Sequence, residues 1–178
     1  MANICMVDLS CKGTEANVKE FIRAMKFQDE YKECGVGRIF EVFEIDEFAW
    51  DGLYYAKLGC DVAWSVKSAI RNEYNPNNIE ELSERLGLTI EIFSRELGIG
   101  FMEHFVVENG TVMCDDCFDY YECDIDEFEE MMQNGDIGDD FWEQDYVVEA
   151  GVTKENYMEF VRDGYLEIGG CELNWEFV

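Results

Sequence analysis

Between Glu96 and Thr153 the chain contains acidic residues but no Lys or Arg, and this is the feature that most constrains its fold. Disordered acidic segments are poor in aromatic and β-branched residues. This stretch instead keeps large apolar residues at folding spacings, namely Phe101, Phe105, Val106, Val107, Phe118, Tyr120, Phe128, Phe141, Trp142 and Tyr146. It is therefore expected to fold into a rigid surface of carboxylates, which is nearly of one sign, like a nucleic-acid backbone.

The acidic excess is concentrated in the C-terminal part of the chain. The formal net charge is −28, and 48 % of the 178 residues are hydrophobic, enough for a sizeable core. Residues 1–100 hold 18 acids and 11 bases, whereas residues 101–178 hold 23 acids against Lys154 and Arg162. Adaptation to high salt would make the whole surface acidic, so this asymmetry favours a local function of the charge.

The charge and the opening residues exclude several classes of protein. Direct binding to nucleic acid or to an anionic membrane needs a basic surface, which the chain lacks. Residues 1–8 have no charged n-region and no long apolar run, so we expect no secretory signal and a cytoplasmic protein. In that compartment we expect reduced thiols rather than disulfides at Cys5, Cys11, Cys34, Cys60, Cys114, Cys117, Cys123 and Cys171.

The first half of the chain predicts a ferredoxin-like α+β fold. Apolar patterns predict strands near residues 2–9, 39–48, 53–58 and 88–93, with a turn at Asp51-Gly52 between the second and the third. Helices are expected after Thr14, over 64–71, and after Asn78, which forms a capping box with Glu81 and precedes the helix end at Gly87. Counting the helices after Thr14 and Asn78, the order is strand, helix, strand, strand, helix, strand, as in the ferredoxin-like arrangement. Breaks are expected at Gly35 and Gly37 and at residues 75–77.

The second half predicts a hairpin followed by an acidic helical extension. A strand over 101–107 turns at Asn109-Gly110 into residues 111–114. Helices are expected near 124–134 and 153–163, and a last strand over 173–178. We therefore divide the chain into a ferredoxin-like domain with an added hairpin, residues 1–123, and an acidic helical extension packed on it, residues 124–178.

Three stretches resemble a known family. They are the first strand and helix, residues 62–66 (Val-Ala-Trp-Ser-Val), and residues 92–104 (Ile-Phe-Ser-Arg-Glu-Leu-Gly-Ile-Gly-Phe-Met-Glu-His), which lead to Asn109-Gly110. Over roughly residues 1–123 the chain resembles the YubB-type ferredoxin-like proteins of phages and plasmids. The resemblance implies a ferredoxin-like fold and an origin in a mobile element, and hence a bacterial host cell, rather than any particular reaction.

The candidate site is the acidic array itself. On the predicted helix, Asp126 faces Glu129 and Glu130, and each like-charge pair costs about 0.2–0.5 kcal/mol. Such a cost without structural gain favours a function over a merely solvated face. Trp142 fills a core position, the role we favour, or anchors an interface. The predicted partner-binding residues are Asp115, Asp116, Asp119, Glu122, Asp124, Asp126, Glu127, Glu129, Glu130, Asp136, Asp139, Asp140, Trp142, Glu143 and Asp145.

Other chemistry has weaker support in the sequence. Cys114-x2-Cys117 with Cys123, and His104 or Cys171, supplies only one closely spaced ligand pair, so a zinc site is disfavoured. No residue spacing supports a nucleophile with its base, and no phosphate-binding loop is present. We therefore predict no metal, no cofactor and no catalytic residue.

These observations predict an acidic protein-binding inhibitor. Its carboxylates would mimic nucleic acid and block the basic surface of a host defence enzyme, such as a CRISPR effector or a restriction enzyme. The alternative is a small hydrolase or nucleotide-handling enzyme that uses carboxylates in a cleft, with or without a divalent ion.

Overall fold

A computed structural model describes residues 4–26, 39–70 and 78–171. The described residues form two compact units: unit 1 contains residues 4–26, 39–70, 78–96 and 103–117, and unit 2 contains residues 97–102 and 118–171. Compactness does not show which part folds alone, so the division at residue 123 stays a prediction. The expected breaks at Gly35, Gly37 and 75–77, and the last strand, lie outside the described residues.

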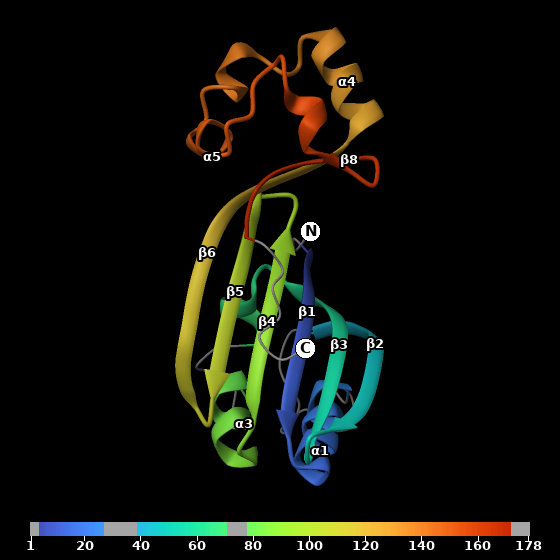
Figure 1. The fold of residues 1–178 in the computed structure, drawn as a ribbon, viewed down its shortest axis with the longest axis vertical. Helices are drawn as coiled ribbons and strands as arrows, with labels where there is room; N and C mark the ends of the chain where they lie inside the picture. Colours follow the sequence, from blue (N-terminus) through green and yellow to red (C-terminus); the bar gives the residue numbers. More distant parts are fainter. Residues whose placement is uncertain (1–3, 27–38, 71–77, 172–178) are drawn as a thin grey trace. The chain divides into compact units, whose positions relative to one another are not determined.

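Unit 1 is built on a mainly antiparallel sheet, which confirms the α+β class (Figure 1). Strand β1 lies between β3 and β4 and is antiparallel to both. The neighbours follow in the order β2, β3, β1, β4, β5, β6. Their bounds are β1 Ile4–Gly13, β2 Ile39–Trp50, β3 Leu53–Ala63, β4 Thr89–Glu96, β5 Phe101–Glu108 and β6 Thr111–Asp124.

Two tight turns set the hairpins of unit 1, as the sequence predicts. Asp51 and Gly52 have φ angles of 49° and 80°, and Asn109 and Gly110 have φ angles of 48° and 78°. Positive φ at both central residues is the geometry that matches the twist of adjacent strands. After the second turn β6 continues to Asp124, ten residues beyond the expected end of the strand at Cys114.

Helix α1 (Glu15–Lys26) closes the core of unit 1. Its apolar residues recur at helical spacing, and the side chains of Val18, Phe21, Ile22 and Met25 are buried. They pack with inward-facing strand residues such as Leu9 in one apolar cluster. Thr14 starts the helix as expected, because its Oγ1 accepts a hydrogen bond from the Asn17 N–H at 3.3 Å.

Helix α3 (Ile79–Leu86) has the ends that the sequence predicts. The Asn78 side chain accepts a hydrogen bond from the Glu81 N–H at 2.8 Å, and Gly87 ends the helix with a φ of 59°. Ile79 and Leu82 are buried in the same cluster as α1. The helix expected over 64–71 is the short α2 (Val66–Ala69).

Unit 2 consists of short helices around a small sheet. Its strand β8 (Tyr165–Gly169) pairs with the end of β6, from Tyr120 to Asp124, and with β7 (Val161–Arg162). The predicted helix near 124–134 is confirmed as α4. The helical elements are α4 Ile125–Asn134, η1 Asp139–Phe141, α5 Asp145–Glu149 and η2 Tyr157–Phe160.

The predicted helix near 153–163 is wrong. That segment contains only the 3-10 turn η2, followed by β7. Asp163 and Gly164 have φ angles of 49° and 90°, so they form a tight turn that returns the chain into β8. Leu166 and Ile168 then alternate inward, and pairing with this strand holds Val161 in an extended conformation.

Unit 2 has its own apolar core, despite its charge. Phe128 of α4 is fully buried, and its ring contacts those of Phe141, Trp142 and Tyr157 at centroid distances of 5.6–6.1 Å. Burying one such aromatic side chain contributes about 1.5–3 kcal/mol. The carboxylates of unit 2 are therefore carried on a packed framework, as the spacing of its apolar residues predicts.

Candidate functional site

The predicted partner-binding residues are divided between the two units. Asp115 and Asp116 are exposed on the part of β6 that belongs to unit 1. The other thirteen residues belong to unit 2. Those exposed there are Asp119, Asp124, Asp126, Glu127, Glu130, Asp136, Asp139, Asp140, Glu143 and Asp145, and those half-buried are Glu122, Glu129 and Trp142.

Helix α4 keeps several like charges on adjacent turns. Asp124 caps it, because its Oδ1 accepts from the N–H groups of Asp126 and Glu127 at 3.0 and 3.2 Å. Negative charge at this end is favourable to the helix dipole. Glu129 and Glu130 lie further along, and the last turn contains no basic residue that would relieve them. Only Glu129 gains a contact, a 3.2 Å hydrogen bond from the Tyr157 hydroxyl.

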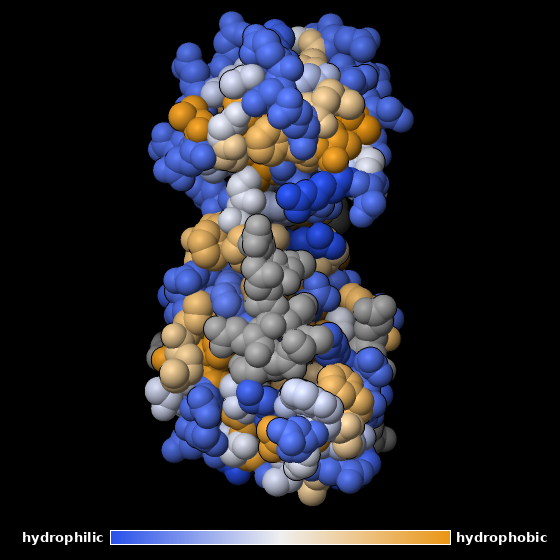
Figure 2. Space-filling model, viewed as in Figure 1, coloured by the Kyte–Doolittle hydropathy of each residue, from blue (hydrophilic) through white to orange (hydrophobic). Residues whose placement is uncertain are grey.

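The negative charge of unit 2 is not neutralised within the unit. From residue 97 to 102 and from 118 to 171 the sequence contains seventeen acids and two bases, Lys154 and Arg162. Both bases are exposed, and neither forms an ion pair with a carboxylate of the described residues. Hydrophilic residues cover much of the face of unit 2 that Figure 2 shows around α4 and α5. Repulsion of this kind is relieved by a basic partner or by salt.

Trp142 is part of the core rather than an isolated surface anchor. Its ring lies nearly perpendicular to those of Phe128 and Phe141, with centroids 6.1 and 5.1 Å away, and it also contacts Tyr157. Edge-to-face packing of this kind stabilises aromatic clusters. Core packing is the role that the sequence analysis favours for this residue, and an interface role for it stays a prediction.

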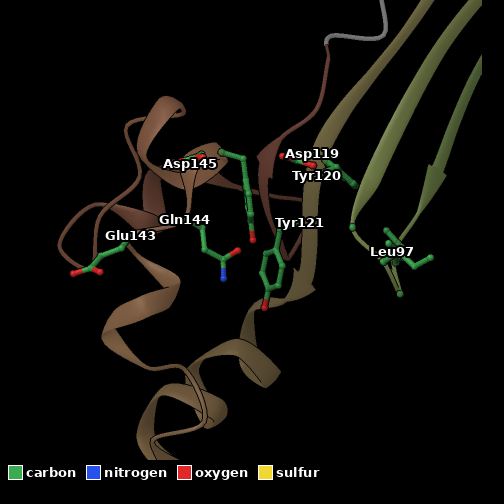
Figure 3. A pocket seen from close by; sticks show the side chains of 11 residues that line it. Leu97, Asp119, Tyr120, Tyr121, Glu143, Gln144 and Asp145 are labelled. Carbon is green, nitrogen blue, oxygen red and sulfur yellow. The ribbon is translucent and has the colours of Figure 1, made fainter.

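An open pocket of about 620 Å³ brings three of the predicted acids together in unit 2 (Figure 3). Figure 3 shows Gln144 and Tyr121 pointing toward one another from its two sides, whereas Glu143 points away from them. The lining residues are Leu97, Gly98, Ile99, Gly100, Asp119, Tyr120, Tyr121, Glu143, Gln144, Asp145 and Tyr146. Aromatic rings beside carboxylates suit a guanidinium or ammonium group, which both attract.

Two tyrosines of the pocket, Tyr121 and Tyr146, stay protonated at neutral pH. Burial raises the pKa of Tyr146, and the nearby carboxylate of Asp119 raises it further. Burial likewise raises the pKa of Tyr121 well above its ordinary value, and a hydrogen bond with Cys123 adds to the effect. The charge of the pocket therefore comes from its carboxylates, while the phenols supply neutral rings and hydroxyl groups.

Close backbone contact holds one wall of the pocket. The Tyr120 N–H donates a hydrogen bond to the Gly100 carbonyl at 2.9 Å. Gly100 has a φ of 85°, and a Cβ there would lie 2.8 Å from the Tyr120 carbonyl oxygen. Only glycine fits this combination of positive φ and close approach. The loop of residues 97–100 is therefore fixed against β6.

Tyr121, Gln144, Tyr146 and the loop of residues 97–100 are not among the site residues that the sequence predicts. These residues come together only because the start of β5 and the segment 143–146 are both placed beside β6. The one local signal that could have indicated the pocket is the pair Gly98 and Gly100, in a short connection between two strands. Such glycines permit close approach of the backbone.

The structure places the other candidate residues as follows. His104 and Cys114 lie together, with Cys114 Sγ 3.5 Å from His104 Nδ1. Among the described residues no group of three or more His, Cys, Asp or Glu side chains is arranged to hold a metal ion. The same part of the chain contains no helix with the length and apolar character needed to cross a membrane. Nothing here adds support to the zinc alternative.

Comparison of the chain with protein families, with curated proteins and with solved structures finds no match.

Proposed function

We propose that this protein is an acidic inhibitor from a mobile element that mimics nucleic acid. It binds the basic nucleic-acid-binding surface of a bacterial defence enzyme, a CRISPR effector or a restriction enzyme, in the cytoplasm of the host. The single observation that carries the proposal is unit 2, where the described residues include seventeen acids and two bases around a packed aromatic core. A fixed array of this kind competes with phosphates for Lys and Arg.

Within unit 2 the pocket gives this binding its most specific contact. Its tyrosine rings and the carboxylates of Asp119 and Asp145 suit the side chain of one Arg or Lys from the partner. Exposed carboxylates around it provide long-range attraction, which speeds association but weakens as salt rises. Affinity would then depend on both the pocket and the surrounding charge.

The ferredoxin-like arrangement and the YubB-type resemblance belong to the same proposal. We infer a ferredoxin-like unit made of β1, α1, β2, β3, α3 and β4, to which β5 and β6 are added. The order β2, β3, β1, β4 and the antiparallel pairing of β1 with β3 and β4 support it. A relation to proteins of phages and plasmids would make an anti-defence role biologically coherent.

The test is an inhibition assay with two matched charge-reversal variants. The first replaces four exposed acids of unit 2, Glu130, Asp139, Asp140 and Glu143, with Lys. The control replaces four exposed acids of unit 1, Glu41, Glu81, Glu84 and Glu108, with Lys, so both variants change the net charge equally. Each protein is added to a panel of purified restriction enzymes and CRISPR effectors cleaving labelled DNA.

We expect the unmodified chain and the unit 1 variant to inhibit at least one enzyme, with weaker inhibition as NaCl rises. The unit 2 variant should lose inhibition by at least about tenfold, since several desolvated charge pairs of 1.5 kcal/mol or more would be lost. Equal inhibition by both variants, or inhibition that added salt and competitor DNA do not affect, would contradict nucleic-acid mimicry.

The pocket also supports the carboxylate-enzyme alternative, because a concave site with several acids is what that alternative requires. Asp119→Asn and Asp145→Asn separate the two functions. If the protein is an inhibitor, each substitution should weaken its binding to the defence enzyme modestly. If it is a hydrolase, each should abolish turnover of a phosphoester or glycoside substrate, and neither the unmodified chain nor the variants should inhibit a defence enzyme.

A further inference from the structure

Three side chains on neighbouring strands of unit 1 form a continuous chain of contacts. Glu91 lies on β4, His104 on β5 and Cys114 on β6. Glu91 Oε1 is 3.0 Å from His104 Nε2, and Cys114 Sγ is 3.5 Å from His104 Nδ1. A thiol, an imidazole and a carboxylate in this order are the parts of a nucleophilic triad, which is recognised by geometry rather than by sequence position.

The carboxylate sets the imidazole in the state that a base requires. Nε2 lies 3.0 Å from Glu91 Oε1, so in the tautomer that carries its proton on Nε2 the imidazole donates to this oxygen. Nδ1 then presents its lone pair to the Cys114 thiol. The ring of Phe93 stacks on that of His104, with centroids 4.3 Å apart and planes 2° from parallel, and so fixes the orientation of the imidazole.

Burial also suits these roles. Glu91 is fully buried, the His104 side chain is 19 % exposed, and Cys114 is half-buried on a strand whose neighbours in sequence are exposed. The thiols of Cys5, Cys11 and Cys60 have no such access, and burial raises the pKa of each to about 12. Cys114 is therefore partly accessible to solvent and has a base beside it, unlike those three buried cysteines.

We propose that Cys114 is a nucleophile that accepts an acyl group from an ester or a thioester. His104 is its general base, and Glu91 is a positioning residue that acts through His104. This activity lies in unit 1 and is independent of the proposed binding by unit 2, so either can fail without the other.

The reaction balances with the groups present. His104 Nδ1 takes the thiol proton while Sγ attacks the carbonyl carbon of the donor. A C–S bond forms, the bond to the alkoxide or thiolate leaving group breaks, and the leaving group takes the proton from His104. Water, activated by the same Nδ1, then hydrolyses the thioester and returns Cys114 to the thiol.

Asp116 restrains this nucleophile and provides a sharp test. Its Oδ2 lies 3.2 Å from Cys114 Sγ on the same strand. A negative charge at that distance opposes formation of the thiolate, and it competes with His104 for the thiol proton. Removing the charge should therefore increase the reactivity of Cys114, whereas removing His104 should decrease it.

The first experiment measures alkylation of Cys114 and Cys117 by iodoacetamide in the full chain at neutral pH. Cys117 is exposed on the same strand and serves as the internal control. Trypsin cannot separate the two cysteines, because no Lys or Arg lies between Glu96 and Thr153. Cleavage before Asp115 and Asp116 separates them for mass spectrometry.

We expect His104→Gln to slow alkylation of Cys114 by at least about tenfold while leaving Cys117 unchanged. Asp116→Asn, a substitution at an exposed position, should speed alkylation of Cys114. Glu91→Gln should slow it, and Glu91→Asp should restore part of the rate. If neither His104→Gln nor Asp116→Asn changes the ratio of the two alkylation rates, the proposal is overturned.

The second experiment uses p-nitrophenyl acetate as the acyl donor. We expect release of p-nitrophenol together with one acetyl group on Cys114 in the intact protein. Both should be absent from Cys114→Ala and strongly reduced in His104→Gln, with circular dichroism confirming that each variant is folded. Release of p-nitrophenol at the same rate from Cys114→Ala as from the unmodified chain would contradict an acyl-accepting thiol.

Discussion

Buried thiols make the stability of unit 1 sensitive to alkaline pH. The pKa of Cys5, Cys11 and Cys60 is raised from 9.0 to about 12, with burial as the largest cause in each case. The folded protein therefore holds these protons between pH 9 and 12, whereas the unfolded chain releases them near pH 9. Their contribution to stability is fully present below pH 9 and is lost as pH rises toward 12.

We therefore expect the free energy of unfolding to fall between pH 8.5 and 10.5. Each thiol contributes a slope of up to about 1.4 kcal/mol per pH unit above pH 9. Urea titrations at several pH values, in the presence of a reductant, measure this slope. Cys11→Ala leaves a smaller slope than the unmodified chain if burial is the cause, whereas a slope that is unchanged in this variant would point to other groups.

Residue chemistry could be predicted only where it depends on local sequence. Thr14, Asn78 and Gly87 act within one helical turn, so their roles follow from the sequence alone. The contact of His104 with both Glu91 and Cys114 depends on the register of three strands, which the apolar pattern does not specify at single-residue precision. The sequence alone therefore does not bring Glu91, His104 and Cys114 together.

At the level of elements, the cap of α3 is a quantitative test of the fold of unit 1. Asn78 is largely buried, and its Oδ1 accepts from the Glu81 N–H at 2.8 Å. Asn78→Ala leaves that donor without its acceptor and should reduce the free energy of unfolding by about 1 kcal/mol. Chemical denaturation measures it. Asn78→Asp, which keeps an acceptor at the same place, should retain most of the stability, and equal losses in the two variants would contradict a capping role.

The elements also show which signals of the sequence were sufficient. The Asp51-Gly52 and Asn109-Gly110 turns were predicted because these residues readily adopt positive φ. Asp163-Gly164 is a signal of the same kind, but the apolar residues before it were interpreted as a helix. The segments that precede and follow such a turn are too short to show a period of two, so β7 and β8 were not predicted.

At the scale of the whole molecule, the α+β class and the concentration of charge followed from the sequence, because both depend on composition and periodicity summed over many residues. The pocket of unit 2 could not be predicted from the sequence. Gly100 and Tyr146 both line it because of the path of the chain, and no local pattern indicates this. The charge itself makes a global prediction, because unit 2 has seventeen acids against two bases and salt sets the distance over which the acids repel one another.

Raising NaCl from about 0.05 to about 0.5 M should therefore stabilise unit 2 more than unit 1, because the screening length falls from roughly 14 to roughly 4 Å. Hydrogen exchange followed by mass spectrometry resolves the two units, and the protection of α4 and β8 should rise more than that of β1 and β3. In the unit 2 charge-reversal variant this gain should shrink, since fewer like charges remain to be screened, whereas the matched unit 1 variant should keep it. The same gain in protection throughout β1, β3, α4 and β8 would indicate a general effect of salt and would contradict local repulsion.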